Sequence, residues 1–134
     1  MGIIFHDGAF KNLSQVRKLT IYGCGLSTPP NIKWICSTLE NMDLTNNNLT
    51  TLPLEYFDGC KKMRYLHLED NSLITMPYLY DLRETLAFIS LANNDIKRCH
   101  YLCEGYFTKL ETIIMDGNRL KEFQFSLGKP DLGF

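Results

Sequence analysis

The sequence has no excess of charge of either sign and no long apolar run. Its 134 residues hold 14 lysines and arginines against 15 aspartates and glutamates, a formal net charge of −1. Nucleic-acid-binding domains usually carry a clear excess of basic residues, so this balance argues against nucleic acid as a partner. The uncharged apolar stretches are far shorter than the roughly 20 residues of a membrane-spanning helix, so we expect no direct membrane insertion in this segment. The five cysteines are an odd number, so at most four can pair within the chain.

One segment of eleven residues recurs five times along the chain. The copies start at residues 16, 39, 63, 86 and 110 and read VRKLTIYGCGL, LENMDLTNNNL, MRYLHLEDNSL, LAFISLANNDI and LETIIMDGNRL. Positions one, four, six and eleven are apolar in every copy. The ninth positions are Cys24, Asn47, Asn71, Asn94 and Asn118, which are 23 or 24 residues apart. A fixed period in this range indicates a stacked solenoid, because one unit cannot bury its own apolar side.

Each copy predicts one short strand. Its fourth and sixth positions are two residues apart, which sends both side chains to the same face of a strand. We expect the five strands to pair in parallel as one sheet. The ninth-position asparagine turns the chain away from the strand, and its amide can hydrogen-bond to backbone groups of the buried bend.

The pattern L-x-x-L-x-L-x-x-N-x-L resembles the leucine-rich-repeat family over nearly the whole chain, and TTLPLEYFDGCKK after Leu49 is similar to its typical extracellular subclass. The resemblance implies an α/β solenoid, a horseshoe with a concave parallel β-sheet of five strands and an irregular or helical convex side held by Leu52, Pro53 and Phe57. We expect a single domain, residues 1–134, in which residues 1–15 form a partial repeat. The last residues, KEFQFSLGKPDLGF, would supply a convex half with no strand after it. No cysteine-rich cap is present, so we expect an excerpt of a longer array.

The cysteines offer two readings. Cys36 lies 12 residues after the ninth position of its repeat and Cys60 lies 13 after its own, which places both at nearly the same height on adjacent units. They are either a disulfide pair or two small buried residues. Cys99 occupies an inward slot that favours a buried free thiol, with Cys103 as an alternative disulfide partner. His100 adds a third potential ligand there, but structural zinc prefers four, so we expect no metal and no cofactor.

Side chains between the buried positions point out of the concave face, where members of the family usually bind their partners. Tyr65 and Phe88 occupy equivalent positions on neighbouring strands, and exposed aromatic residues ringed by polar groups are frequent hot spots of binding. The alternative is that this pair only stabilises its own sheet. Acidic residues nearby favour a partner with basic groups. The candidate partner-binding residues are Tyr22, Asp43, Tyr65, His67, Glu69, Phe88 and Asp116.

Asp43, His67 and Ser90 occupy the same position on three consecutive strands, about 4.8 Å apart, and so imitate a nucleophilic triad. A hydrolase also needs an oxyanion hole, whereas the N–H groups of a regular strand are committed to the sheet. We therefore expect no enzyme activity, and a hydrogen-bonded Asp43–His67 pair instead.

The resemblance implies a non-catalytic module that binds a protein or other macromolecule, in a secreted or cell-surface protein of innate immunity, adhesion or a receptor ectodomain. The sequons at Asn12 and Asn48 favour an extracellular glycoprotein, although about one sequon is expected by chance. The alternative is a cytoplasmic scaffold or regulatory subunit whose cysteines stay reduced. Exposed strand edges at both ends would permit end-to-end or homo-oligomeric association.

Overall fold

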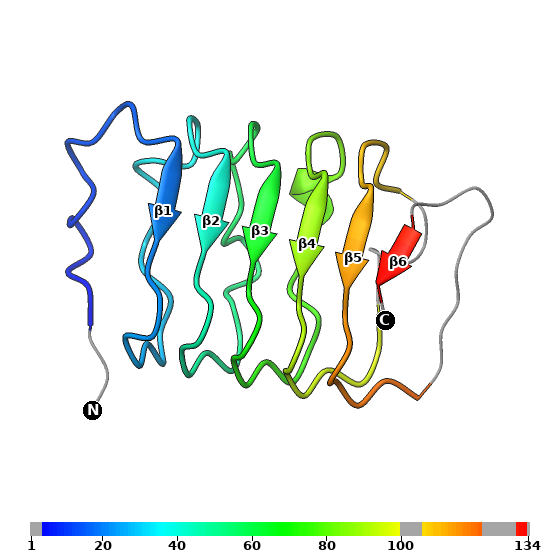
Figure 1. Ribbon diagram of the computed structural model, residues 1–134. Helices are drawn as coiled ribbons and strands as arrows, with labels where there is room; N and C mark the ends of the chain where they lie inside the picture. The colour runs from blue at the N-terminus through cyan, green and yellow to red at the C-terminus, as the bar shows by residue number, and fades with distance from the viewer. Residues whose placement is uncertain (1–3, 100–105, 122–130, 134) are drawn as a thin grey trace.

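The computed structural model describes residues 4–99, 106–121 and 131–133, and its strands form one parallel sheet (Figure 1). The sheet runs in chain order from β1 to β6, and each strand pairs in parallel with the next. The solenoid predicted from the repeats is confirmed. The elements are β1 (Lys18–Thr20), β2 (Asn41–Asp43), β3 (Tyr65–His67), the 3₁₀ helix η1 (Tyr80–Leu82), β4 (Phe88–Ser90), β5 (Thr112–Ile114) and β6 (Asp131–Gly133).

The sixth strand corrects the expectation that no strand follows the fifth repeat. β6 pairs with β5, with Leu132 opposite Ile113 in the register. The segment around it, KPDLGF, contains neither the paired apolar positions nor the asparagine of the other copies. Its strand conformation continues a ladder that β5 has already begun, so the pattern of its own side chains gave no signal for it.

The repeated apolar positions form the core. Of the twenty residues at positions one, four, six and eleven of the five copies, seventeen are buried. The other three, Val16, Leu19 and Leu120, are partly buried and pack against that core. Because each coil places the same four positions inward, neighbouring coils cover one another's apolar side, as the period required.

The convex side is built mostly of turns, and η1 is the one helical element among the described residues. Phe57 is buried and Leu52 packs partly against the core, whereas Pro53 is exposed, so the convex role inferred for Pro53 is only that of a surface residue. In the first fifteen residues, Phe5 and Phe10 also pack against the core.

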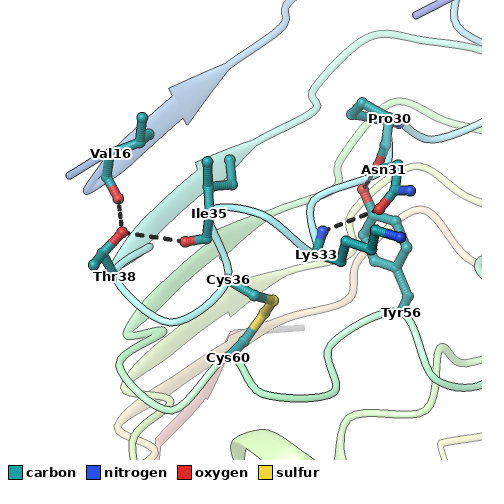
Figure 2. Close-up of a disulfide and its surroundings, with 9 residues drawn as sticks. All are labelled: Val16, Pro30, Asn31, Lys33, Ile35, Cys36, Thr38, Tyr56 and Cys60. Carbon is teal, nitrogen blue, oxygen red and sulfur yellow. Dashed lines mark hydrogen bonds between the residues drawn. A yellow bond between two sulfur atoms is a disulfide. The ribbon is translucent and has the colours of Figure 1, made fainter. Parts of the chain in front are cut away.

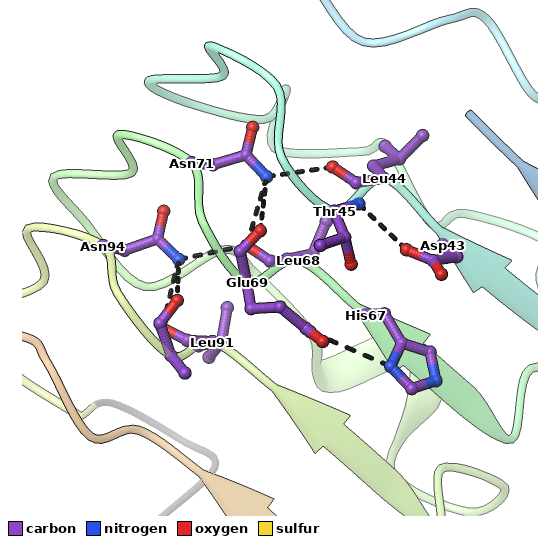
Figure 3. Close-up of polar contacts among 10 residues, drawn as sticks. Asp43, Leu44, Thr45, His67, Leu68, Glu69, Asn71, Leu91 and Asn94 are labelled. Atoms are coloured by element: carbon purple, nitrogen blue, oxygen red, sulfur yellow. Dashed lines mark hydrogen bonds and ion pairs between the residues drawn. The ribbon is translucent and has the colours of Figure 1, made fainter. Parts of the chain in front are cut away.

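The ninth-position asparagines join each coil to the one before it. The Nδ2 of Asn71 donates to the carbonyl oxygen of Leu44, one coil back, at 3.0 Å and to that of Leu68 in its own coil at 3.2 Å (Figure 3). Its Oδ1 accepts a hydrogen bond from the Leu49 N–H at 3.0 Å. The same three kinds of bond recur at Asn47, Asn94 and Asn118. The predicted role of asparagine in the bend is therefore confirmed.

The residue before each of these positions has a left-handed backbone, which the apolar pattern of the repeat does not predict. These five residues have φ between 55° and 73°. A left-handed conformation is costly for residues other than glycine, and asparagine and aspartate tolerate it best. The signal was present in the sequence, since the five residues are Gly23, Asn46, Asp70, Asn93 and Gly117.

Cys36 and Cys60 form a disulfide across two neighbouring coils of the convex side (Figure 2). Their Cα atoms are 4.4 Å apart, and both residues are buried. Cys24 is a free cysteine. Cys99 is disulfide-bonded, so the expectation of a free thiol there is wrong, and Cys103 lies outside the described residues.

Candidate functional site

The alternation of side chains along the strands creates the concave surface. In β3 the central residue, Leu66, is buried, whereas Tyr65 and His67 on either side of it face outward and are exposed and partly exposed. The register places Tyr65 opposite Asn41 on β2 and Phe88 on β4. Outward-facing residues of consecutive coils therefore lie side by side as rows across the sheet.

The aromatic residues of this surface are arranged differently from the expected Tyr65–Phe88 pair. The ring of Phe88 lies against the imidazole of His67, with centroids 4.9 Å apart. The guanidinium of Arg64 lies 5.7 Å from the centre of the Tyr65 ring, a cation–π geometry. Tyr65 is 40% exposed and Tyr22, at the β1 end, is 61% exposed. Two tyrosine faces and the edge of a His–Phe pair are thus available to solvent.

The triad imitation does not assemble. The carboxylate of Asp43 accepts a hydrogen bond from the backbone N–H of Thr45 at 2.9 Å, so it supports the bend after β2. The Nδ1 of His67 instead lies 3.8 Å from Oε2 of Glu69 (Figure 3). The expected Asp43–His67 hydrogen bond is therefore wrong, because each side chain finds a partner closer along its own coil. Ser90 is buried at 4% exposure.

Two acceptor atoms of this surface have no hydrogen-bond donor among the described residues. They are Oδ1 of Asn41 and Oε2 of Glu69, each of which is itself buried. Buried polar atoms are normally hydrogen-bonded, so unpaired ones call for an explanation. Both belong to side chains that are only partly buried, next to Tyr65 and His67 respectively, and a donor from a partner would satisfy them.

The remaining candidate positions lie around this centre. Asp116 is exposed in the bend after β5. The sequon residues Asn12 and Asn48 are exposed and lie outside the outward-facing strand positions. In the described part of the chain, no group of three or more His, Cys, Asp or Glu residues could hold a metal ion, and His100 falls outside that part. None of the described helices has the length and apolarity needed to cross a membrane.

Comparison with known proteins identifies the repeats. Residues 37–96 match the family described as leucine rich repeat. The chain is 32% identical over 92 residues to mouse fibromodulin, covering 67% of this chain and 23% of fibromodulin. It is 30% identical over 116 residues to protein PAC2 of Saccharomyces cerevisiae, covering 83% and 21%, and 24% identical over 106 residues to bovine osteomodulin, covering 79% and 24%. The chain thus spans about a quarter or less of these relatives.

Solved structures agree on the fold. Internalin C2 of Listeria monocytogenes superposes with a TM-score of 0.73 at 24% identity over 85% of this chain and 48% of that one. A leucine-rich-repeat protein of Leptospira interrogans gives 0.76 at 20% identity over 90% and 30%. The solenoid is therefore a leucine-rich-repeat fold. The chain belongs to the leucine-rich-repeat family, with repeats of the typical extracellular subclass.

Proposed function

We propose that this chain is a non-catalytic recognition module that binds a protein partner carrying basic groups through its concave face. A protein-interaction role is the general one for the family, which is typically non-catalytic. The observation that carries the choice of face is the unpaired acceptor of Glu69, beside His67 and close to the exposed ring of Tyr65. A lysine or arginine from a partner would donate to that carboxylate and stack on the tyrosine.

The charges of the surface support a basic partner. Asp43, Glu69 and Asp116 lie along the C-terminal side of the strands, and Asp70 and Asn93 extend this row with a hydrogen bond of 2.9 Å between their side chains. Acidic surfaces accelerate and orient the approach of basic partners. Tyrosine adds contact area at a small cost in side-chain entropy, since it has few rotatable bonds.

The proposed location is extracellular, within a secreted or cell-surface glycoprotein. Three relatives, fibromodulin, osteomodulin and podocan, are extracellular matrix proteins. The Cys36–Cys60 disulfide also fits an oxidising compartment, because structural disulfides are rare in the cytosol. Asn12 and Asn48 are exposed, as glycan acceptors must be, and glycans there would leave the concave rows uncovered.

The test is selection of binders followed by a matched pair of variants. A phage-displayed library of random peptides is panned on the wild-type chain, and the affinity of the enriched peptides is measured by interferometry. We expect the peptides to be rich in lysine and arginine. We also expect Tyr65→Ala/Phe88→Ala to weaken their binding at least about tenfold, the effect of losing one hot spot. The control is Leu54→Ala/Ile74→Ala, two exposed apolar residues outside the concave face.

Thermal melts of both double variants separate loss of the surface from loss of the fold. Equal binding by the wild type and the Tyr65/Phe88 variant would refute the assignment of the concave face. Enrichment of acidic or purely apolar peptides would refute the proposed basic partner.

A further inference from the structure

A groove runs along the edge of the sheet where the strands begin, on a different part of the solenoid from the proposed protein-binding rows. Its volume is about 680 Å³. Four of its lining residues, Glu40, Arg64, Ala87 and Glu111, immediately precede β2, β3, β4 and β5. The groove therefore crosses four consecutive coils, a length of about 14 Å at the usual strand spacing of about 4.8 Å.

The lining is basic although the chain as a whole is not. Four of the ten lining residues, Lys61, Lys62, Arg64 and Lys109, are basic and only Glu40 and Glu111 are acidic. Among the described residues the salt bridges include none of the three lysines. Their charges are thus available to a ligand, in a chain whose net charge is −1.

One of the two acids is already neutralised. The Arg17 Nε donates to Oε2 of Glu40 at 2.6 Å, and Arg17 is not among the residues that line the groove. This hydrogen bond lowers the pKa of the Glu40 carboxyl, and the charges of Lys62 and Arg64 lower it further. The groove is therefore a place where a negative charge is stabilised.

The rest of the lining is hydroxyl-rich and contains little apolar surface. Thr85 and Thr108 contribute hydroxyl groups, and only Ala87 and Leu110 are apolar. Oγ1 of Thr85 is buried without a hydrogen-bond partner among the described residues. An unpaired buried hydroxyl is costly, and a rotation about its side-chain bond would offer it to an acceptor in the groove.

We propose that this groove binds a linear sulfated polysaccharide. Lysines act as separate point charges, which suits sulfate groups repeated along a flexible chain. The threonine hydroxyls suit the hydroxyls and ether oxygens of sugars. An acidic peptide would need apolar pockets for its anchoring side chains, and the groove offers few. Nucleic acid is disfavoured because the acidic residues elsewhere on the chain would repel a long polyanion that leaves the groove.

This site is independent of the proposed protein-binding role, although Arg64 lies at the boundary because its guanidinium covers Tyr65. The test therefore changes only lysines. The groove variant is Lys61→Gln/Lys62→Gln/Lys109→Gln. The matched control is Lys11→Gln/Lys33→Gln/Lys97→Gln, which removes the same charge from exposed lysines outside the groove.

The probe is a heparin dodecasaccharide of defined length, with the affinity measured by calorimetry between 50 and 300 mM salt. We expect the groove variant to bind at least about tenfold more weakly than the wild type at 150 mM salt, and its salt slope to fall by about two to three. The control variant and Tyr65→Ala/Phe88→Ala should stay within about threefold of the wild type. The last comparison separates this proposal from the concave-face proposal.

Two results would overturn the inference. One is an unchanged affinity of the groove variant, with its melting temperature intact, because the groove would then not be the binding site. The other is equal or tighter binding of polyglutamate or of a single-stranded oligonucleotide of matched charge, which would assign the groove to an acidic peptide or to nucleic acid.

Discussion

Replacing Asn71 with alanine should destabilise the solenoid far more than the loss of one polar side chain usually does. Asn71 is 8% exposed and sits between two coils. Its amide donates to the carbonyl oxygens of Leu44 and Leu68 and accepts from the Leu49 N–H. Alanine removes all three hydrogen bonds and leaves three backbone groups without a partner.

The size of the effect follows from these groups. A buried N–H left unpaired costs about 1–3 kcal/mol, and each carbonyl oxygen that loses its hydrogen bond adds about 0.5–1.5 kcal/mol. We therefore expect Asn71→Ala to lower the free energy of unfolding by about 3–5 kcal/mol, a large part of the usual total of about 5–15 kcal/mol. For a chain of this length that lowers the melting temperature by about 10–18 °C.

The assay is thermal and urea denaturation followed by circular dichroism, with Asn48→Ala as the control. Asn48 is exposed, and only its backbone N–H is hydrogen-bonded, to the Leu26 carbonyl at 2.7 Å. The control should change stability by no more than about 0.5 kcal/mol. If Asn71→Ala melts within about 3 °C of the wild type, water replaces the amide at little cost, and the Asn71 side chain does not hold the two coils together.

Two further predictions concern the backbone and the charges. Gly117 has φ of +73°, and a Cβ there would approach Oδ1 of Asn93 to 2.1 Å, whereas Gly59, at +82°, has no atom within 4 Å of such a Cβ. Gly117→Ala should therefore cost about 1 kcal/mol more than Gly59→Ala in chemical denaturation, and equal costs would show that the Asn93 side chain moves aside freely. Because Arg17 lowers the pKa of the Glu40 carboxyl, the ion pair stabilises the fold above the ordinary glutamate pKa and loses its effect as the pH falls through the lowered value. In an NMR titration Arg17→Ala should move the Glu40 pKa upward, and an unmoved pKa would assign the shift to other charges.

The sequence predicted the fold well because the repeat states its constraints several times. The apolar positions of each coil can be satisfied only by a neighbouring coil, so five copies with the same spacing leave one arrangement, a parallel stack. The asparagine of the bend was predictable for a similar reason, since a buried turn needs donors and acceptors that a short amide supplies. The strand β6 escaped prediction because its segment, around Leu132, does not carry the pattern.

The candidate site was less predictable because it depends on rotamers rather than on spacing. The period places Asp43, His67 and Phe88 on the same surface, which the structure shows. It does not say which neighbour each side chain faces. His67 lies between Glu69 in its own coil and the ring of Phe88 in the next, whereas Asp43 turns to a backbone N–H. Choices between contacts of similar energy are decided by local geometry, which no one-dimensional pattern contains.

The asparagine bonds also bear on how such a chain changes over evolutionary time. Every seam between coils is made in the same way, from an amide that reaches backward to the preceding coil. A duplication or loss of one complete unit of 23 or 24 residues, the interval between successive asparagines, would therefore recreate a seam of the same chemistry. An insertion of any other length inside a strand or bend would break one. The coil behaves as an exchangeable part, and lineages can lengthen or shorten the array while its surface residues diverge freely.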